Sequence, residues 1–304
     1  PLDPESPATG RVALVEAQAN CPFQAYAAFR LNAEPWPQRS DGLTPAERGS
    51  LVHATLADFW RGLPDQEALL ALEGAAWTAR CEGAVDAALE ILPAQRWALL
   101  GDTIRNLERE RLLGLLREWL AVEYGRPPFA VVATEAKRSL LIAGLELRLK
   151  VDRIDRIGDN ALVVIDFKTG KSTLLDLQRA QRLVAPQLPL YAEALAPDPV
   201  VALAYATVRR GESKVAGIAA SGDIWDALHA AAPDWVTTRT RWKTQLWELV
   251  DEYRRGVATV DPWQYPGTCD RCGRQALCRI NEHVAFVDRE RRVLDHGDEE
   301  SAAQ

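Results

Sequence analysis

The sequence predicts a mixed α/β protein in which a β-sheet follows a long, mostly helical segment. Strong helix signals occupy residues 44–61, and helical patterns continue through most of residues 65–124. Residues 129–167 then change to β-rich runs separated by turn sequences. Because the spacing of apolar residues changes from helical to strand-like only at this point, we expect a central mixed sheet flanked by helices. The segment at about 62–125 is a predicted helical insertion before that sheet.

Two helices are predicted before the insertion. Residues 12–30 carry apolar side chains at helical spacing and include Cys21. The sequence Thr-Pro-Ala-Glu at 44–47 supplies an N-cap, a proline at the first helical position and a capping-box glutamate. The second helix should therefore extend from this cap to about Arg61.

Two turn sequences organise the predicted sheet. Residues 129–157 form two predicted strands that turn near Ala143-Gly144. Gly158-Asp159-Asn160 is a favourable hairpin connection into a third strand at 161–167. The later elements expected are a short helix at 187–195, a strand at 200–208 and a long helix at about 223–256.

The chain is expected to fold as one domain with a short extension. The domain covers residues 1–285 and includes a cysteine-bearing loop at 266–280. The remaining residues, 286–304, are strongly charged and are predicted to form a flexible tail.

The composition is that of a globular protein, with 304 residues of which 47% are hydrophobic and 26% charged. No apolar run approaches the roughly 18 residues of a membrane span, and the first ten residues lack the features of a signal peptide. We therefore expect a cytoplasmic location and no membrane partner. Because the chain begins at Pro1 and contains no methionine, we also expect it to be a domain of a larger protein.

The charge balance leaves nucleic-acid binding open. A net charge of −7 disfavours extended contact with phosphates, which requires lysine and arginine. Local basic clusters nevertheless occur, for example at 148–156 and 239–243. Each cluster could be a solvated face or one wall of a binding groove.

Two aspartates and a lysine suggest hydrolytic chemistry. Asp152 and Asp166 lie on neighbouring predicted strands, and Lys168 follows Asp166 by two positions. Residues 166 and 168 share one face of their strand because side chains alternate along it. Two carboxylates and an amine so arranged can hold a divalent metal and an activated water, as phosphodiester hydrolysis requires. The alternative is a salt bridge at the end of a strand.

Two further motifs complete an ordered series. Gly-Ser-Leu-Val-His at 49–53 places a histidine in the capped helix, and Gln187-x3-Tyr191 places two polar side chains on one helical face. The order Gly-x3-His, Asp, Asp-x-Lys and Gln-x3-Tyr resembles that of the RecB-type nucleases of the PD-(D/E)xK superfamily. The resemblance spans roughly residues 12–280 and implies a restriction-endonuclease-like fold.

The resemblance also implies a set of metal ligands. His53, Asp152 and Asp166 would bind the ion, and the backbone carbonyl of Phe167 would complete the inner shell. Oxygen-rich coordination of this kind suits Mg²⁺ or Mn²⁺. Lys168 would orient the attacking water and stabilise the charge that develops on the phosphate.

Three more residues are candidate members of the site. The resemblance implies that Gln187 and Tyr191 line the site and support the ligands or the substrate strand. Glu135 ends a predicted strand and is either a further acidic participant or a surface carboxylate. Two departures from the family pattern stand out, namely Leu149-Lys150-Val151 in place of a small residue before Asp152, and Pro189 within the Gln-x3-Tyr motif.

The function implied by the resemblance is that of a metal-dependent DNA nuclease. Family membership further implies an exonuclease that is fused to or partnered with a helicase and acts in DNA recombination or repair. One alternative is a DNA-binding or helicase-docking module with vestigial nuclease activity. Another is a stand-alone CRISPR-associated exonuclease.

Four of the five cysteines suggest a metal centre. Cys269, Cys272 and Cys278 have C-x2-C-x5-C spacing, which favours metal binding over disulfides in a cytoplasmic protein. With Cys21 as a distant partner, the set is similar to that of AddB-type and CRISPR-associated nucleases that carry a [4Fe–4S] cluster. The resemblance implies a structural cluster, and Zn²⁺ is the alternative occupant because four thiolates can hold either. Cys81 is expected to be a buried free thiol.

Overall fold

A mixed sheet of seven strands lies within residues 8–35, 40–170 and 182–282, the residues that this computed structural model describes. Its strands are β1 (Ala8–Arg11), β2 (Ala130–Ile142), β3 (Leu145–Ile157), β4 (Ala161–Lys168), β5 (Val200–Thr207), β6 (Lys214–Ala219) and β7 (Leu228–Ala230). Strand β2 pairs antiparallel with β3, while β1 and β4 pair with the first and second parts of β3. Parallel β4–β5 and β6–β7 pairs and an antiparallel β5–β6 pair complete the sheet.

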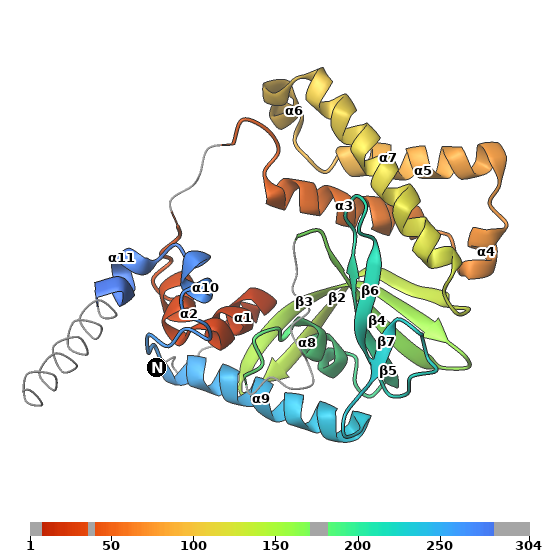
Figure 1. The fold of residues 1–304 in the computed structure, drawn as a ribbon. Helices are drawn as coiled ribbons and strands as arrows, with labels where there is room; N and C mark the ends of the chain where they lie inside the picture. The colour runs from red at the N-terminus through yellow and green to blue at the C-terminus, as the bar shows by residue number, and fades with distance from the viewer. Residues whose placement is uncertain (1–7, 36–39, 171–181, 283–304) are drawn as a thin grey trace, which may run out of the picture.

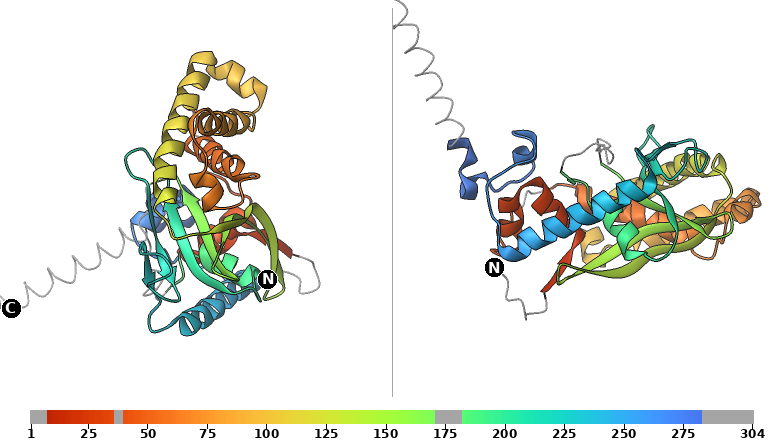
Figure 2. Two further views of the ribbon diagram at one scale, coloured as in Figure 1. Left: turned by 90° about the vertical axis from the view of Figure 1, so that its right-hand side faces the viewer. Right: turned by 90° about the horizontal axis from the view of Figure 1, so that it is seen from below.

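Helices lie on both sides of this sheet. They are α1 (Val12–Asn20), α2 (Pro22–Phe29), α3 (Pro45–Trp60), α4 (Gln66–Leu70), α5 (Gly74–Leu89), α6 (Ala94–Leu100), α7 (Asp102–Tyr124), α8 (Gln187–Ala194), α9 (Trp235–Arg255), α10 (Gly267–Asp270) and α11 (Gln275–Cys278). Figure 1 shows α3 to α7 gathered above the sheet and α9 below it. The view from below in Figure 2 places α9 in front of the strands. The predicted fold class, a mixed sheet flanked by helices and preceded by a helical segment, is confirmed.

Alternating residues of β4 face two separate hydrophobic cores. Leu162 and Val164 join the core formed with α1, α8 and α9, whereas Val163, Ile165 and Phe167 join the core formed with α3, α5 and α7. This is the two-residue period expected of a strand that is covered on both faces. Asp166 consequently lies on the same face as Leu162 and Val164, which is the face covered by α8.

The start of α3 agrees with its sequence prediction. Thr44 Oγ1 accepts a hydrogen bond from Glu47 N at 3.1 Å, and Glu47 Oε2 accepts one from Thr44 N at 2.7 Å. This reciprocal capping box satisfies two donors at the helix N-terminus. Arg96 adds an ion pair to Glu47 at 2.7 Å and lowers the pKa of that carboxyl to about 2.

The two predicted turns of the sheet are also present. Turns at 143–144 and 158–160 connect β2 to β3 and β3 to β4. Gly144 has a φ of 74°, and a Cβ at this position would lie 1.9 Å from Nη1 of Arg254 on α9. The same Nη1 donates to the carbonyl of Ala143 at 2.6 Å. The positive φ therefore favours glycine in the turn, and a larger residue would also displace the Arg254 side chain.

Two predicted helices are wrong in extent. The helix expected at 12–30 is broken at Cys21, whose extended backbone (φ −168°, ψ 118°) separates α1 from α2. Pro22 explains the break, because a proline disfavours helical backbone in the residue before it and can begin a new helix. The helix expected at 223–256 begins only after Asp234, whose side chain caps α9 by accepting from Thr237 N at 2.8 Å.

Three strands were missed. Strands β1 and β6 were not predicted, and residues 228–230, which lie within the predicted helix, form β7. The cysteine-bearing loop contains the short helices α10 and α11. No helix within the described residues is long and apolar enough to cross a membrane. The predicted tail at 286–304 lies outside the described residues.

A buried ion network joins the insertion to the sheet. Glu123 on α7 contacts Arg153 on β3 at 2.7 Å and Arg126 at 2.8 Å. Asp155 contacts the same two guanidinium groups, each at 2.7 Å. The guanidinium of Arg153 also lies 4.1 Å from the ring centroid of Trp60 on α3. Residue Arg153 follows Asp152 directly, so this network anchors the strand that carries a candidate ligand.

Candidate active site

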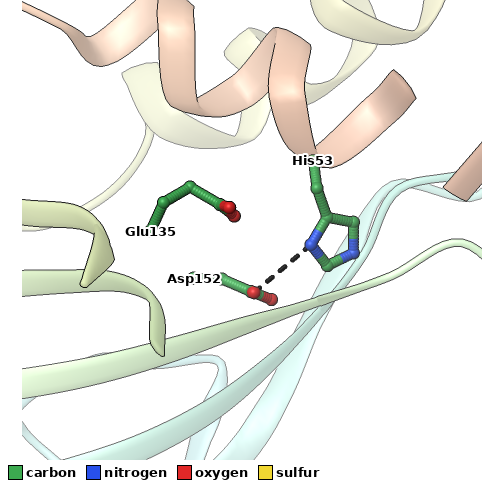
Figure 3. A group of neighbouring side chains, drawn as sticks. All are labelled: His53, Glu135 and Asp152. Carbon is green, nitrogen blue, oxygen red and sulfur yellow. Dashed lines mark ion pairs between the residues drawn. The ribbon is translucent and has the colours of Figure 1, made fainter. Parts of the chain in front are cut away.

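Three potential metal ligands from separate elements converge beside β3. His53 projects from α3, Glu135 from β2 and Asp152 from β3, as Figure 3 shows. One ligand atom from each residue lies within 4.8 Å of the others. His53 Nδ1 is 3.3 Å from Asp152 Oδ1, while the other oxygen, Oδ2, accepts from the backbone N of Phe167 at 2.8 Å. This last bond links Asp152 to the strand that carries Asp166.

Asp166 is a fully buried carboxylate whose neighbour Lys168 supplies its counter-charge. Lys168 Nζ lies 2.7 Å from Asp166 Oδ2. Asp166 Oδ1 is also buried, and it has no hydrogen-bond partner among the described residues. A buried acceptor without a donor is costly, and a cation would satisfy it.

The electrostatics of the site favour a bound cation. Burial raises the pKa of Asp166, and the nearby Asp152 carboxylate adds to the rise while the Lys168 ammonium opposes it. For His53, burial lowers the pKa, but the hydrogen bond and charge of Asp152 outweigh burial, so the net shift is upward. The upward shift at His53 reflects the negative charge of Asp152, Asp166 and Glu135 around it, whereas the upward shift at Asp166 reflects chiefly its burial.

A chain of hydrogen bonds fixes the orientation of Lys168. Its Nζ donates to Gln187 Oε1 at 2.5 Å, and Gln187 Nε2 donates to Tyr191 Oη at 2.8 Å. Tyr191 Oη in turn donates to the carbonyl of Lys150 at 2.7 Å. The Gln-x3-Tyr spacing places both side chains on one face of α8, and Pro189 is accommodated in the first turn of this helix.

Glu135 has an unusual backbone for a strand residue. Its φ is 51°, in the left-handed region, although it lies within β2. The paired residues on either side, Thr134 with Arg153 and Ala136 with Val151, place it opposite Asp152. Its carboxylate forms an ion pair with Lys150. Non-glycine residues in this conformation are strained and are concentrated at functional sites.

The four predicted cluster cysteines also come together. Cys21, Cys269, Cys272 and Cys278 all line one small cavity of about 20 Å³, and none forms a disulfide. Backbone contacts hold the ends of the chain around it, with Phe23 N donating to the carbonyl of Thr259 at 3.0 Å. Figures 1 and 2 show α10 and α11 beside α1 and α2.

Cys81 differs from these four. It is buried in α5 as a free thiol, as predicted, and burial raises its pKa to about 11. Burial and the other three cysteines of the cavity raise the pKa of Cys269 as well.

The family follows from the sequence comparison. A model described as the PD-(D/E)XK nuclease superfamily matches residues 12–279, which is most of the chain. The chain belongs to the PD-(D/E)XK nuclease superfamily. This result confirms the family to which the motifs were assigned.

Individual relatives of the chain are more distant. Over 61 residues it is 41% identical to one subunit of the ATP-dependent helicase/deoxyribonuclease of Streptococcus mutans. That match covers 20% of this chain and 6% of the relative, so the chain spans only a small part of the relative's length. A solved structure from Eubacterium rectale, provisionally assigned as an exonuclease, aligns over 87% of both chains with 12% identity and a TM-score of 0.40.

The structure adds Glu135 to the predicted ligands His53 and Asp152 in one close group. Asp166, the third predicted side-chain ligand, pairs with Lys168 at 2.7 Å. Sequence analysis did not identify Lys150, which contacts both Glu135 and Tyr191. Its only sequence signal was its departure from the small residue usual at that place in the family.

Proposed function

We propose that the chain is a divalent-metal-dependent DNA nuclease domain that acts as an exonuclease beside a helicase. The observation that carries the proposal is the convergence of His53, Glu135 and Asp152 within 4.8 Å, next to the Asp166–Lys168 pair. Membership of a nuclease superfamily supports the reaction class. The helicase/deoxyribonuclease subunit that the chain partly matches supports DNA as substrate and a helicase as partner, in recombination or repair.

The residues present fit Mg²⁺ or Mn²⁺. His53, Asp152 and Asp166 are the proposed ligands together with the backbone carbonyl of Phe167, and Glu135 is placed to join them. One imidazole nitrogen with several carboxylate oxygens suits these ions better than thiolate-binding metals. The unsatisfied Asp166 Oδ1 is an available ligand atom. When bound, such an ion lowers the pKa of a water molecule and neutralises the scissile phosphate.

Among the chain's own residues, we propose Lys168 as the main catalytic side chain. Its ammonium group would orient the attacking water and offset the charge that develops on the phosphate as the P–O bond breaks. Asp166 and Gln187 hold that group from two directions. Tyr191 fixes Gln187, so Lys168 is positioned before substrate arrives and loses little freedom on reaction.

The cysteine site supports a [4Fe–4S] cluster as a structural cofactor. Cys21, Cys269, Cys272 and Cys278 line one small cavity, and none of them forms a disulfide. A [4Fe–4S] cluster would take one thiolate on each of its irons, and Zn²⁺ is the alternative occupant because four thiolates can hold either.

The test of the proposed function is a cleavage assay on labelled linear and circular DNA, single- and double-stranded, with Mg²⁺, Mn²⁺ or EDTA. Protein would be purified without oxygen so that any cluster is retained. We expect metal-dependent loss of linear DNA, abolished in Asp166→Ala and Lys168→Ala. Loss of linear but not circular substrates would establish that ends are required.

Matched variants separate loss of chemistry from general damage. Asp159→Ala removes an exposed carboxylate in the β3–β4 turn, and Lys214→Ala removes an exposed lysine on β6. Both should cleave like the unmodified protein. If the unmodified protein binds DNA but cuts no substrate with either metal, the binding-module alternative is correct.

A further inference from the structure

Two lysines at the candidate site are each paired with a carboxylate. Lys168 Nζ lies 2.7 Å from Asp166 Oδ2, and Lys150 Nζ forms an ion pair with Glu135 Oε2. The proposed mechanism uses Lys168 but not Lys150. Glu135 is also one of the three potential metal ligands drawn in Figure 3. One carboxylate is therefore within reach of both Lys150 and a metal ion.

The side chain of Lys150 is open to solvent. It is 55% exposed, compared with 31% for Lys168. Lys150 lies two residues before Asp152 on β3, so side-chain alternation places both residues on one face of the strand. An ammonium group in this position can contact a ligand carboxylate and also a molecule that approaches the metal ligands from solvent.

Exposed cations surround Lys150 on this part of the sheet. Lys137 on β2 is paired directly opposite Lys150, and Arg148 lies two residues before Lys150 on β3. Arg148 is in turn paired with Arg11 on β1. All four residues are exposed. Like charges that lie directly opposite each other on neighbouring strands are destabilising, and an anionic partner would offset their repulsion.

The backbone of Lys150 is fixed relative to the catalytic groups. Its carbonyl accepts from Tyr191 Oη at 2.7 Å, which is the last hydrogen bond in the chain that begins at Lys168. Because this bond uses the main chain of residue 150, a change of the side chain leaves it in place. The charge of Lys150 can therefore be removed without removing the support of Lys168.

We propose that Lys150 is a further substrate-positioning residue, which neutralises Glu135 until a divalent ion takes that carboxylate and then binds a phosphate of the substrate strand. This inference rests on the proposed nuclease function and gives it an order of binding, metal before substrate. An ammonium group on Glu135 lowers the attraction of that carboxylate for another cation. Once Glu135 is a metal ligand, the charge of Lys150 is no longer neutralised and attracts a phosphate.

Titration of the protein with Mn²⁺ in the absence of nucleic acid, followed by calorimetry, tests the competition for Glu135. Lys150→Met keeps the apolar stem but removes the charge. It should tighten Mn²⁺ binding about 5-fold, the scale of a partly exposed ion pair. The gain should be largely lost when Glu135→Gln is present in both proteins, because Lys150 then has no carboxylate to neutralise.

Lys243→Met is the matched control, because it removes the same charge from an exposed lysine on α9 rather than from the strands of the site. Its Mn²⁺ affinity should equal that of the unmodified protein. Lys150→Arg is a conservative variant that should also behave like the unmodified protein, since a guanidinium group can pair with either a carboxylate or a phosphate.

Binding of a labelled oligothymidylate with and without Mn²⁺ tests the phosphate contact. All proteins would carry Lys168→Ala so that the probe is not cleaved. The factor by which Mn²⁺ strengthens binding should be about 5-fold smaller with Lys150→Met than with Lys243→Met. In Mn²⁺ the slope of log K against log salt concentration should become shallower by about 0.7 in Lys150→Met, as for one phosphate contact on a single strand. Without Mn²⁺ the slope should not change.

The outcomes separate the two parts of the inference from the proposed function. Mn²⁺ affinity in Lys150→Met that is equal to or weaker than that in Lys243→Met would overturn the competition for Glu135. An equal effect of Mn²⁺ on oligonucleotide binding in these two variants would overturn the phosphate contact. Hydrolysis of bis(p-nitrophenyl) phosphate by the unmodified protein with Mn²⁺ tests the nuclease function itself. Its absence would count against that function and leave both binding results standing.

Discussion

At the scale of single residues, Glu135 shows most directly how the site constrains the backbone. Its φ of 51° lies in a region that costs an L-residue about 1–2 kcal/mol. This conformation accompanies a carboxylate position within 4.8 Å of ligand atoms of His53 and Asp152. A strand residue with no function would be expected to relax to an extended conformation, so we infer that the conformation is retained for metal binding.

Replacement of Glu135 should reverse the usual order of glycine and alanine in a strand. Glu135→Gly and Glu135→Ala both remove the carboxylate and its ion pair with Lys150, but only glycine accepts the positive φ without strain. We expect the glycine variant to unfold with a free energy about 1 kcal/mol higher than that of the alanine variant. Urea denaturation in EDTA measures the difference.

Both Glu135 variants should also bind metal more weakly than the unmodified protein. A ligand that binds only the folded state raises the unfolding temperature, so the rise caused by Mn²⁺ should be smaller in each variant. An alanine variant as stable as the glycine variant would show that the backbone at this position is not strained. An unchanged response to Mn²⁺ would remove Glu135 from the metal site.

At the scale of elements, the packing of α7 against β3 depends on charge rather than on apolar contact alone. Glu123, Arg126, Arg153 and Asp155 are all buried and form ion pairs with one another across the junction. Buried charges are costly to desolvate. Removing one partner from such a network is therefore strongly destabilising, because it leaves the other partner buried without a counter-charge. The network therefore specifies how the helical insertion sits on the strand that carries Asp152.

Removal of one arginine from this network should be strongly destabilising. Arg153→Met leaves Glu123 and Asp155 buried with one guanidinium between them, which should lower the free energy of unfolding by about 3–5 kcal/mol. Arg109→Met is a control on α7, the helix that carries Glu123, because Arg109 pairs with the half-exposed Asp86. That change should cost less than about 1 kcal/mol. Similar losses in the two variants, measured in guanidinium chloride, would contradict the network's role.

At the scale of the whole molecule, the cysteine site links the two ends of the described chain. Cys21 lies between α1 and α2, whereas Cys269, Cys272 and Cys278 lie on or next to α10 and α11. A shared cofactor here would close a loop that includes the helical insertion and every strand of the sheet except β1. Such a cross-link stabilises chiefly by restricting the unfolded chain, and the effect grows with loop length.

Loss of one cluster cysteine should therefore release the segment at 266–282. We expect Cys21→Ser to lose iron and visible absorbance and to unfold with about 2–5 kcal/mol less free energy. The segment should become sensitive to limited proteolysis. Cys81→Ala, which changes a cysteine outside the cavity, should keep its iron. Full iron content in Cys21→Ser would show that Cys21 is not a ligand.

Local sequence was sufficient for the elements whose signals lie within a few residues. The capping box at Thr44 and Glu47, the turn at Gly158, and the placement of Asp166 and Lys168 on one face were all predictable. Each depends on hydrogen bonds or side-chain alternation between near neighbours. The break at Cys21 was predictable on the same grounds, because Pro22 restricts the residue before it.

The remaining features depend on contacts between distant residues. Nothing near Glu135 in the sequence indicates its positive φ, which is explained only by His53 and Asp152 on other elements. Residues 228–230, which lie within the predicted helix, form β7 because they pair with β6, and the site of Cys21 is completed by three cysteines from the far end of the described chain. The sequence by itself thus determined the family, the order of elements and the reactive side chains. Only the tertiary structure decided which of them share a site, because burial and electrostatics act across space rather than along the chain.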